Sequence, residues 1–205
     1  LSTDGLVGAL FIANDGHADP YSLTQALAKG VRMHGGRIFE STQVTELTRE
    51  GSRITHVVTD QGAIEAEVVV NAAGLWARQV GWMAGVELPA GIVHHQYMVT
   101  EKSDLIPDDL PSLRDPDGSF YAKPEPGALA IGGWETSTLP VNPVEGFPWE
   151  NAHHLFEGDL DRMAEIFEPA AHRIPVLNDL GMRTLINGPI PISPDGEPIM
   201  GLAPG

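Results

Sequence analysis

The chain has 205 residues, and 42% of them are apolar, a level typical of a folded globular protein rather than a disordered one. Its 28 acidic and 12 basic residues give a net charge of −16, which argues against nucleic acid and anionic membranes as partners. The absence of cysteine excludes disulfides, thiol nucleophiles and cysteine-based zinc sites.

The N-terminal part predicts a strand followed by a helix. Residues 4–12 have the composition of an internal strand, and the chain does not begin with Met, so we expect a piece of a longer protein. Asp19 and Pro20 are typical of a helix cap and a first helical position, and Gly35 with Gly36 forms the stop. The apolar face expected for this helix consists of Leu23, Ala26, Leu27 and Val31.

Several short strands are expected next. The predicted strands are 37–40, 44–49, 54–60 and 63–66, with a hairpin turn at 50–53. The β-branched run at 68–70 is typical of a strand buried on both faces. It leads through the turn at 71–74 into a helix at 75–84, which together form half of a nucleotide-binding βαβ layout.

The composition changes after Pro89. The expected elements there are an alternating strand at 91–100, a loop at 104–118 and a hairpin of strands 119–123 and 128–133 around 124–127. A proline-rich loop follows at 138–149. An amphipathic helix that contains Leu155, Leu160, Met163 and Phe167 is expected to end at Pro169. The last predicted strand pieces, in residues 181–201, are interrupted by Pro189, Pro191, Pro194 and Pro198.

These elements predict a mixed α/β (α+β) fold with two domains. Residues 1–88 are expected to form a partial nucleotide-binding domain, although the first strand is also compatible with the other domain. Residues 89–205 are expected to form a mostly antiparallel sheet with helices on one face, ending with a return toward the first domain.

Six stretches carry a family resemblance. They are Asp15–Pro20, Val68–Trp76, His95–Tyr97, Gly132–Glu135, Asn187–Pro189 and Ser193–Pro198. In this order and at this spacing they resemble the D-amino-acid oxidase family of flavoproteins, and in particular its sarcosine and dimethylglycine dehydrogenase branch. The resemblance implies FAD as the cofactor, a Rossmann-like FAD-binding domain and a substrate-binding domain.

The resemblance also implies the reaction. An N-methylated amino acid would lose hydride to the flavin N5, and water would then release the methyl group as formaldehyde. The chain has no GxGxxG segment, which argues against FAD binding by this chain alone and predicts that it is inactive in isolation. The alternatives are a truncated domain that folds without a cofactor, or a family member that oxidises glycerol phosphate or a D-amino acid.

The family pattern also assigns residues near the flavin. The residues matched to FAD are Val44, Asn71, Ala72, Ala73, Gly74 and Trp76. Small side chains in the turn would let the dinucleotide approach the backbone, and an ordinary tight turn is the alternative. His95 matches a histidine close to the substrate, where an imidazole can influence the protonation of the amine. A structural histidine is the alternative for His95, and His94 is expected on the opposite face of the strand.

The remaining candidates concern the substrate. The candidate substrate-binding residues are Phe120, Tyr121, Gly133, Arg183 and Asn187. Because Phe120 stands where some relatives have tyrosine, no catalytic phenol is expected there. Tyr121 is expected to face away from Phe120, with a structural role as the alternative, and a turn is the alternative for Gly133. Arg183 is a candidate for binding a carboxylate with two hydrogen bonds, and an exposed salt bridge is the alternative. No metal site is expected. The expected partners are a small-molecule amine and a second copy of the chain, bound through an exposed sheet edge. The expected compartment is the cytoplasm if the source is bacterial and the mitochondrial matrix if it is eukaryotic.

Overall fold

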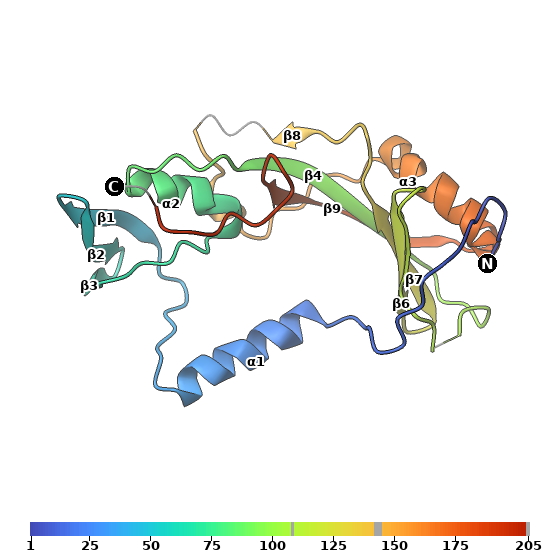
Figure 1. The fold of residues 1–205 in the computed structure, drawn as a ribbon, viewed down its shortest axis with the longest axis horizontal. Helices are drawn as coiled ribbons and strands as arrows, with labels where there is room; N and C mark the ends of the chain where they lie inside the picture. The colour runs from blue at the N-terminus through green and yellow to red at the C-terminus, as the bar shows by residue number, and fades with distance from the viewer. Residues whose placement is uncertain (108, 142–144, 204–205) are drawn as a thin grey trace. The chain divides into compact units, whose positions relative to one another are not determined.

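The structure is a computed structural model that describes residues 1–107, 109–141 and 145–203 (Figure 1). It confirms the predicted mixed α/β class, because helices accompany two antiparallel sheets. The chain forms two compact units, each built from separated segments. Unit 1 consists of Leu1–His17, Ile92–Asn142 and Glu150–Ile190, and unit 2 of Ala18–Gly91, Pro143–Trp149 and Pro191–Gly205. The simpler division into 1–88 and 89–205 stays a prediction.

Unit 2 contains a three-stranded antiparallel sheet, whose strands lie close to those predicted at 44–49, 54–60 and 63–66. Its strands are β1 (Val44–Glu50), β2 (Arg53–Thr59) and β3 (Gly62–Glu65), in the order β1-β2-β3. Gly51 lies in the β1–β2 turn with φ of 64°, a backbone conformation that glycine adopts without strain. The guanidinium of Arg49 donates to the Ala84 carbonyl at 2.5 Å, which ties this sheet to the end of α2 (Ala77–Met83).

The helix α1 (Pro20–Met33) also confirms its prediction. The Asp19 carboxylate accepts from the Ser22 N–H at 2.7 Å, and Gly35 follows the helix with φ of 81°. None of the helix residues is buried, so its expected apolar face is exposed in the described structure.

Three of the strands predicted for residues 1–88 are wrong. Residues 4–12, 37–40 and 68–70 have no strand structure, and Val68 and Val70 are 80% and 82% exposed. A strand needs a partner for its backbone N–H and C=O groups. None of the described strands pairs with residues 68–70, so the β-branched run alone does not produce a strand. The following helix begins as η1 (Gly74–Trp76) and continues as α2.

The larger sheet lies mainly in unit 1, and its central strand is β4 (Gly91–Thr100), with the bounds that the sequence predicts. The strand order is β5-β6-β7-β4-β8, and β9 (Met182–Ile192) also pairs with β4. The other members are β5 (Leu113–Asp115), β6 (Phe120–Glu125), β7 (Ala128–Gly133) and β8 (Pro140–Val141). The expected β6–β7 hairpin is confirmed, whereas β5 and β8 fall in regions predicted as loops.

The helix α3 (Leu160–Arg173) covers one face of this sheet and packs against β6 and β7 (Figure 1). It contains Pro169, so the prediction that this proline ends the helix is wrong. Met163, Ile166 and Ala170 are at most 2% exposed and belong to the main core cluster. Burial of this face on both sides of Pro169 favours a continued helix despite the hydrogen bond that proline cannot donate.

The strand β9 runs without a break through Pro189 and Pro191, so the predicted interruption there is wrong. The strand pairs with β4, and the described residues add only an isolated bridge between Phe156 and Asn187. Proline is tolerated at sheet positions where its missing N–H is not needed by a neighbouring strand.

Replacing Asp159 with alanine is expected to destabilise unit 1 by about 1 kcal/mol. The Asp159 carboxylate caps α3 by accepting from the Arg162 N–H at 3.1 Å. Urea unfolding followed by circular dichroism measures the change. Glu168→Ala is the matched control, because Glu168 is exposed in the middle of the same helix. Equal stability of the two variants would contradict a capping role.

Candidate active site

His95 and Trp134 form an aromatic pair on one face of the larger sheet. The register that places Tyr97 opposite Gly132 brings these two residues to neighbouring strands. Their ring centroids are 4.7 Å apart with an angle of 36° between the planes, and Trp134 remains 53% exposed. Burial lowers the pKa of His95, and the smaller effects of Glu135, which raises this pKa, and Arg162, which lowers it, oppose each other. The imidazole is therefore neutral at neutral pH.

Two tyrosines extend the same face. Tyr97 packs against the small cluster of Val99, Ala128 and Ala130, and Tyr121 lies across Gly132. A Cβ on Gly132 would collide with the Tyr121 ring, so glycine is required for this arrangement. Burial, together with the nearby Tyr97, raises the pKa of Tyr121, and its phenol keeps its proton at neutral pH.

His94 takes part in a different set of contacts. Its ring stacks on Phe156 with centroids 3.7 Å apart, and the Asn187 side-chain nitrogen lies 3.4 Å from its Nδ1. The same Asn187 amide donates to the Glu157 carbonyl at 2.8 Å. Burial lowers the pKa of His94, and Arg162 adds to the effect. Because neighbouring strand residues point to opposite faces, Asn187 lies on the His94 side of the sheet and not on the His95 side.

A buried ion pair, which the sequence reasoning missed, lies beside these residues. The Arg162 guanidinium of α3 donates to the carboxylate of Glu135, and both side chains are at most 7% exposed. The segment after Glu135 is held by α3 as well, because Thr136 and Ser137 donate to Glu165. The sequence signal for a buried charge was Arg162 itself, because it stands next to the apolar Met163 in an amphipathic helix.

Phe120 and Gly133 lie between the sheet and α3. Phe120 is 2% exposed and belongs to the main core cluster. A Cβ on Gly133 would meet the Ser119 carbonyl and, at 3.2 Å, the Ile166 side chain. The structure therefore places both residues in the packing layer under α3, separate from the His95–Trp134 pair. Of the residues matched to substrate, Tyr121 lies on the His95 face, and Arg183 is exposed at the start of β9.

The small-residue turn at 71–74 belongs to unit 2 and is held by its own asparagine. The Asn71 amide donates to the Ala77 carbonyl at 2.7 Å, and its oxygen accepts from the Ala73 N–H at 3.3 Å. Gly74 has φ of 55°, and a Cβ there would have no neighbouring atom within 4 Å. Asn71, Ala72 and Gly74 are exposed, so the backbone of this turn is open to a cofactor, and its contact with flavin stays a prediction.

Trp76 and Val44 contact other parts of unit 2. The Trp76 indole N–H donates to the Pro148 carbonyl at 3.2 Å, and its ring stacks on Trp149 with centroids 6.0 Å apart. Gln79 exchanges two hydrogen bonds of 2.8 Å with the Phe147 backbone, which fixes this segment against α2. Val44 is half-buried at the start of β1. Trp76 therefore has a packing role whether or not a flavin contacts it.

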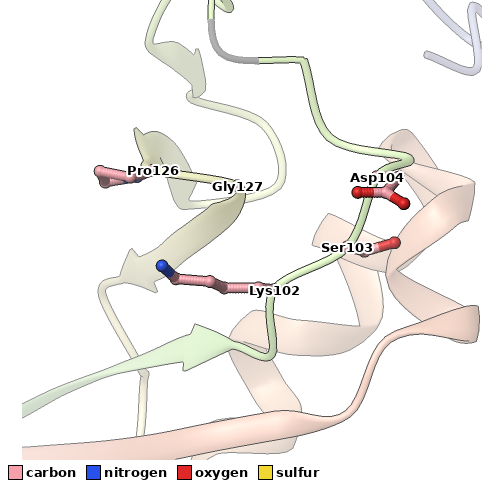
Figure 2. A pocket seen from close by; sticks show the side chains of 5 residues that line it. All are labelled: Lys102, Ser103, Asp104, Pro126 and Gly127. Carbon is pink, nitrogen blue, oxygen red and sulfur yellow. The ribbon is translucent and has the colours of Figure 1, made fainter.

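A shallow pocket of about 580 Å³ lies in unit 1 (Figure 2). Figure 2 shows its lining, which is formed by Lys102, Ser103, Asp104, Pro126 and Gly127. It lies past the end of β4 at the β6–β7 turn and contains none of the candidate site residues.

Within the described ranges, no three histidine or carboxylate side chains gather as a metal site. No helix in the part of the chain that the structure describes has the length and hydropathy to cross a bilayer.

Comparison with known proteins places this chain in a family. The chain is 40% identical to the mitochondrial dimethylglycine dehydrogenase of Rattus norvegicus, over 98% of this chain and 24% of the relative. It is 36% identical to the mitochondrial sarcosine dehydrogenase of Homo sapiens, over 100% of this chain and 22% of the relative. The chain thus spans about a quarter of the length of these relatives.

A solved structure shares the fold. L-proline dehydrogenase from P. horikoshii matches with a TM-score of 0.74 at 24% identity, over 90% of this chain and 47% of that chain. The family model described as DAO, FAD dependent oxidoreductase, matches residues 1–205. These matches confirm the resemblance that the sequence motifs predicted, and the chain belongs to the DAO family of FAD-dependent oxidoreductases.

Proposed function

We propose that the protein carrying this chain is a flavin-dependent oxidoreductase that demethylates an N-methylated amino acid of the sarcosine or dimethylglycine type. The observation that carries this proposal is the His95 ring beside the exposed Trp134 ring, in a chain 40% identical to dimethylglycine dehydrogenase. The mitochondrial location of the relatives named above supports the mitochondrial matrix as the compartment if the source is eukaryotic.

The residues of this chain prepare the amine for oxidation. A secondary or tertiary amine is an ammonium ion at neutral pH, and hydride loss requires its free lone pair. The neutral His95 accepts the ammonium proton on an imidazole nitrogen. The exposed face of Trp134 attracts the cation before deprotonation. Arg183 is a candidate for the substrate carboxylate, because its guanidinium is exposed and can bind both oxygens.

FAD, when bound, supplies the hydride acceptor. The residues proposed to contact it are Val44 and the 71–74 turn, with Trp76 beside them. The methyl carbon becomes the carbon of an iminium ion, water adds to it, and the C–N bond then breaks to give formaldehyde and the demethylated amine. No described residue supplies the glycine-backed helix start that holds a pyrophosphate, so this chain would provide only part of the cofactor site.

The test uses the full-length protein purified with its flavin. Sarcosine, dimethylglycine, glycerol 3-phosphate and D-alanine are added separately without oxygen, and the loss of the visible flavin absorbance and the formaldehyde released are measured. The proposal is supported if either N-methyl compound reduces the flavin and releases one formaldehyde for each substrate molecule oxidised. Reduction only by glycerol phosphate or D-alanine would assign the protein to another activity of the family.

The isolated 205-residue chain is expected to bind no FAD at micromolar concentrations and to oxidise none of these substrates. The reason is the missing GxGxxG segment, which normally binds the pyrophosphate through backbone N–H groups. Fluorescence titration of FAD with the chain measures binding, and the full-length protein stripped of flavin is the positive control. Saturable binding by the chain alone would contradict this expectation.

We also expect the isolated chain to self-associate. Its large exposed apolar side chains include Val7, Leu10, Phe11, Val68, Val70, Met200 and Leu202. In the described sheet of unit 2, β3 pairs only with β2 and leaves an edge open. Sedimentation velocity over a range of concentrations is expected to show dimers or larger species. A single monomeric species at the highest concentration would contradict it.

A further inference from the structure

The first turn of α3 is connected twice to the strands that carry His95 and Trp134. Gln96, the neighbour of His95 in β4, donates to the Asp159 carbonyl at 2.9 Å and accepts from the Asp159 N–H at 3.2 Å. Glu135, the neighbour of Trp134, accepts from the Arg162 guanidinium. Asp159 in turn caps the helix through the Arg162 N–H. The contacts therefore connect His95, through Gln96, to the start of α3, and connect α3, through Glu135, to Trp134.

These contacts are deeply buried. Gln96 is 0% exposed, and Glu135 and Arg162 are each 6% exposed. Among the described residues, Glu135 Oε2 and Arg162 Nε lack hydrogen-bond partners, so desolvation of the pair is incompletely offset. A buried ion pair of this kind contributes little to stability compared with apolar residues of similar volume, and its best supported use is to fix geometry.

A further contact holds the Trp134 segment to the same side of the helix. Thr136 and Ser137 donate to Glu165, which lies one helical turn after Arg162. The hydrogen bonds from Thr136 and Ser137 lower the pKa of Glu165, so its carboxylate stays ionised at neutral pH. Residues 135–137 are therefore attached to α3 at two points.

We propose that the first turn of α3 is a positioning element that sets the His95–Trp134 geometry from the opposite side of the sheet. Gln96 fixes the turn relative to β4, and the Glu135–Arg162 pair fixes the end of β7 relative to the same turn. Gln96, Glu135 and Arg162 are positioning residues, because each acts through its neighbour in the chain and none reaches the His95 face. The kinetic consequence of this role rests on the proposed function.

The test compares two variants that leave no lone buried charge. Glu135→Leu/Arg162→Met replaces the whole ion pair with apolar residues, and Gln96→Leu removes the link to Asp159 at similar volume. Lys123→Met is the control, because it removes a partly exposed ion pair with Glu125 on β6. Circular dichroism establishes folding. Fluorine NMR of fluorotryptophan-labelled protein reports on Trp134, with its signal assigned by Trp134→Phe.

Both variants are expected to fold and to shift or broaden the Trp134 signal, whereas the control leaves it unchanged. In the full-length enzyme, the KM for the N-methylated amino acid is expected to rise roughly five- to tenfold while kcat changes less, because the aromatic contact to the cation is lost. Combining the two variants is expected to add little to either alone, since they interrupt one path.

Folded variants with an unchanged Trp134 signal would overturn the proposal, as would fully additive effects. Unfolding of both variants would also overturn it, because the contacts would then serve the stability of unit 1 as a whole. If the wild-type enzyme oxidises no N-methylated substrate, the proposed function fails, and the fluorine signal still decides whether α3 positions Trp134.

Discussion

Replacing His95 with asparagine is expected to lower kcat/KM for the N-methylated substrate by about 100-fold or more, the usual contribution of a positioned general base. Asparagine keeps a polar side chain of similar reach but cannot take a proton from the ammonium ion. The variant should retain its flavin spectrum and its thermal stability. Stopped-flow flavin reduction measures the loss on the step in which the substrate is oxidised.

The pH dependence gives a second signature of the same residue. Burial lowers the pKa of His95 below its ordinary value of 6.5, so the neutral base predominates above that pKa. The kcat/KM for the substrate, which reports the pKa of the free enzyme, is therefore expected to fall as the pH drops through the lowered pKa, at a more acidic pH than for an exposed histidine. This fall at acidic pH should be absent in His95→Asn.

The control is His153→Asn, because His153 is exposed outside the aromatic pair. It is expected to keep both the wild-type rate and the wild-type fall in kcat/KM at acidic pH. If His95→Asn retained the wild-type rate across the pH range, the proton would have another acceptor, and His95 would have the structural role that the sequence left open.

The parts of the fold that could be predicted from the sequence are those with local signals. Asp19 with Pro20 marks the start of α1, and the alternation of residues 91–100 marks β4. The strand prediction at 68–70 was wrong because a strand also depends on a partner, which β-branched side chains do not supply. The break predicted at Pro169 was wrong because core packing on both sides maintains the helix.

The sequence likewise predicted some contacts of the candidate site and missed others. The period of a strand is sufficient to place His94 and His95 on opposite faces, and the structure gives them separate aromatic partners. The same period places Tyr121 opposite to Phe120. The link between Glu135 and Arg162 joins a strand end to a helix, so no local pattern contains it. The Glu135–Arg162 link depends on both the register of β7 and the packing of α3.

Replacing Ile166 with alanine is expected to destabilise unit 1 by about 3 kcal/mol, within the range measured when buried isoleucine is truncated. Ile166 is 1% exposed in the main core cluster, and its side chain packs close to Gly133 of β7. The loss combines the removed apolar contacts with a cavity that a helix fixed by Gln96 and Glu135 cannot easily close. Urea unfolding followed by the fluorine signal of Trp134 measures it.

The control is Leu160→Ala in the same helix, because Leu160 is 62% exposed. It is expected to change the free energy of unfolding by less than about 0.5 kcal/mol. Within this chain, Trp134 is a suitable reporter of unit 1, since Trp76, Trp82 and Trp149 lie in unit 2. A loss below about 1 kcal/mol in Ile166→Ala would mean that α3 shifts to fill the cavity. A helix that moves so easily could not hold Trp134 beside His95, so the same measurement also tests the positioning role of α3.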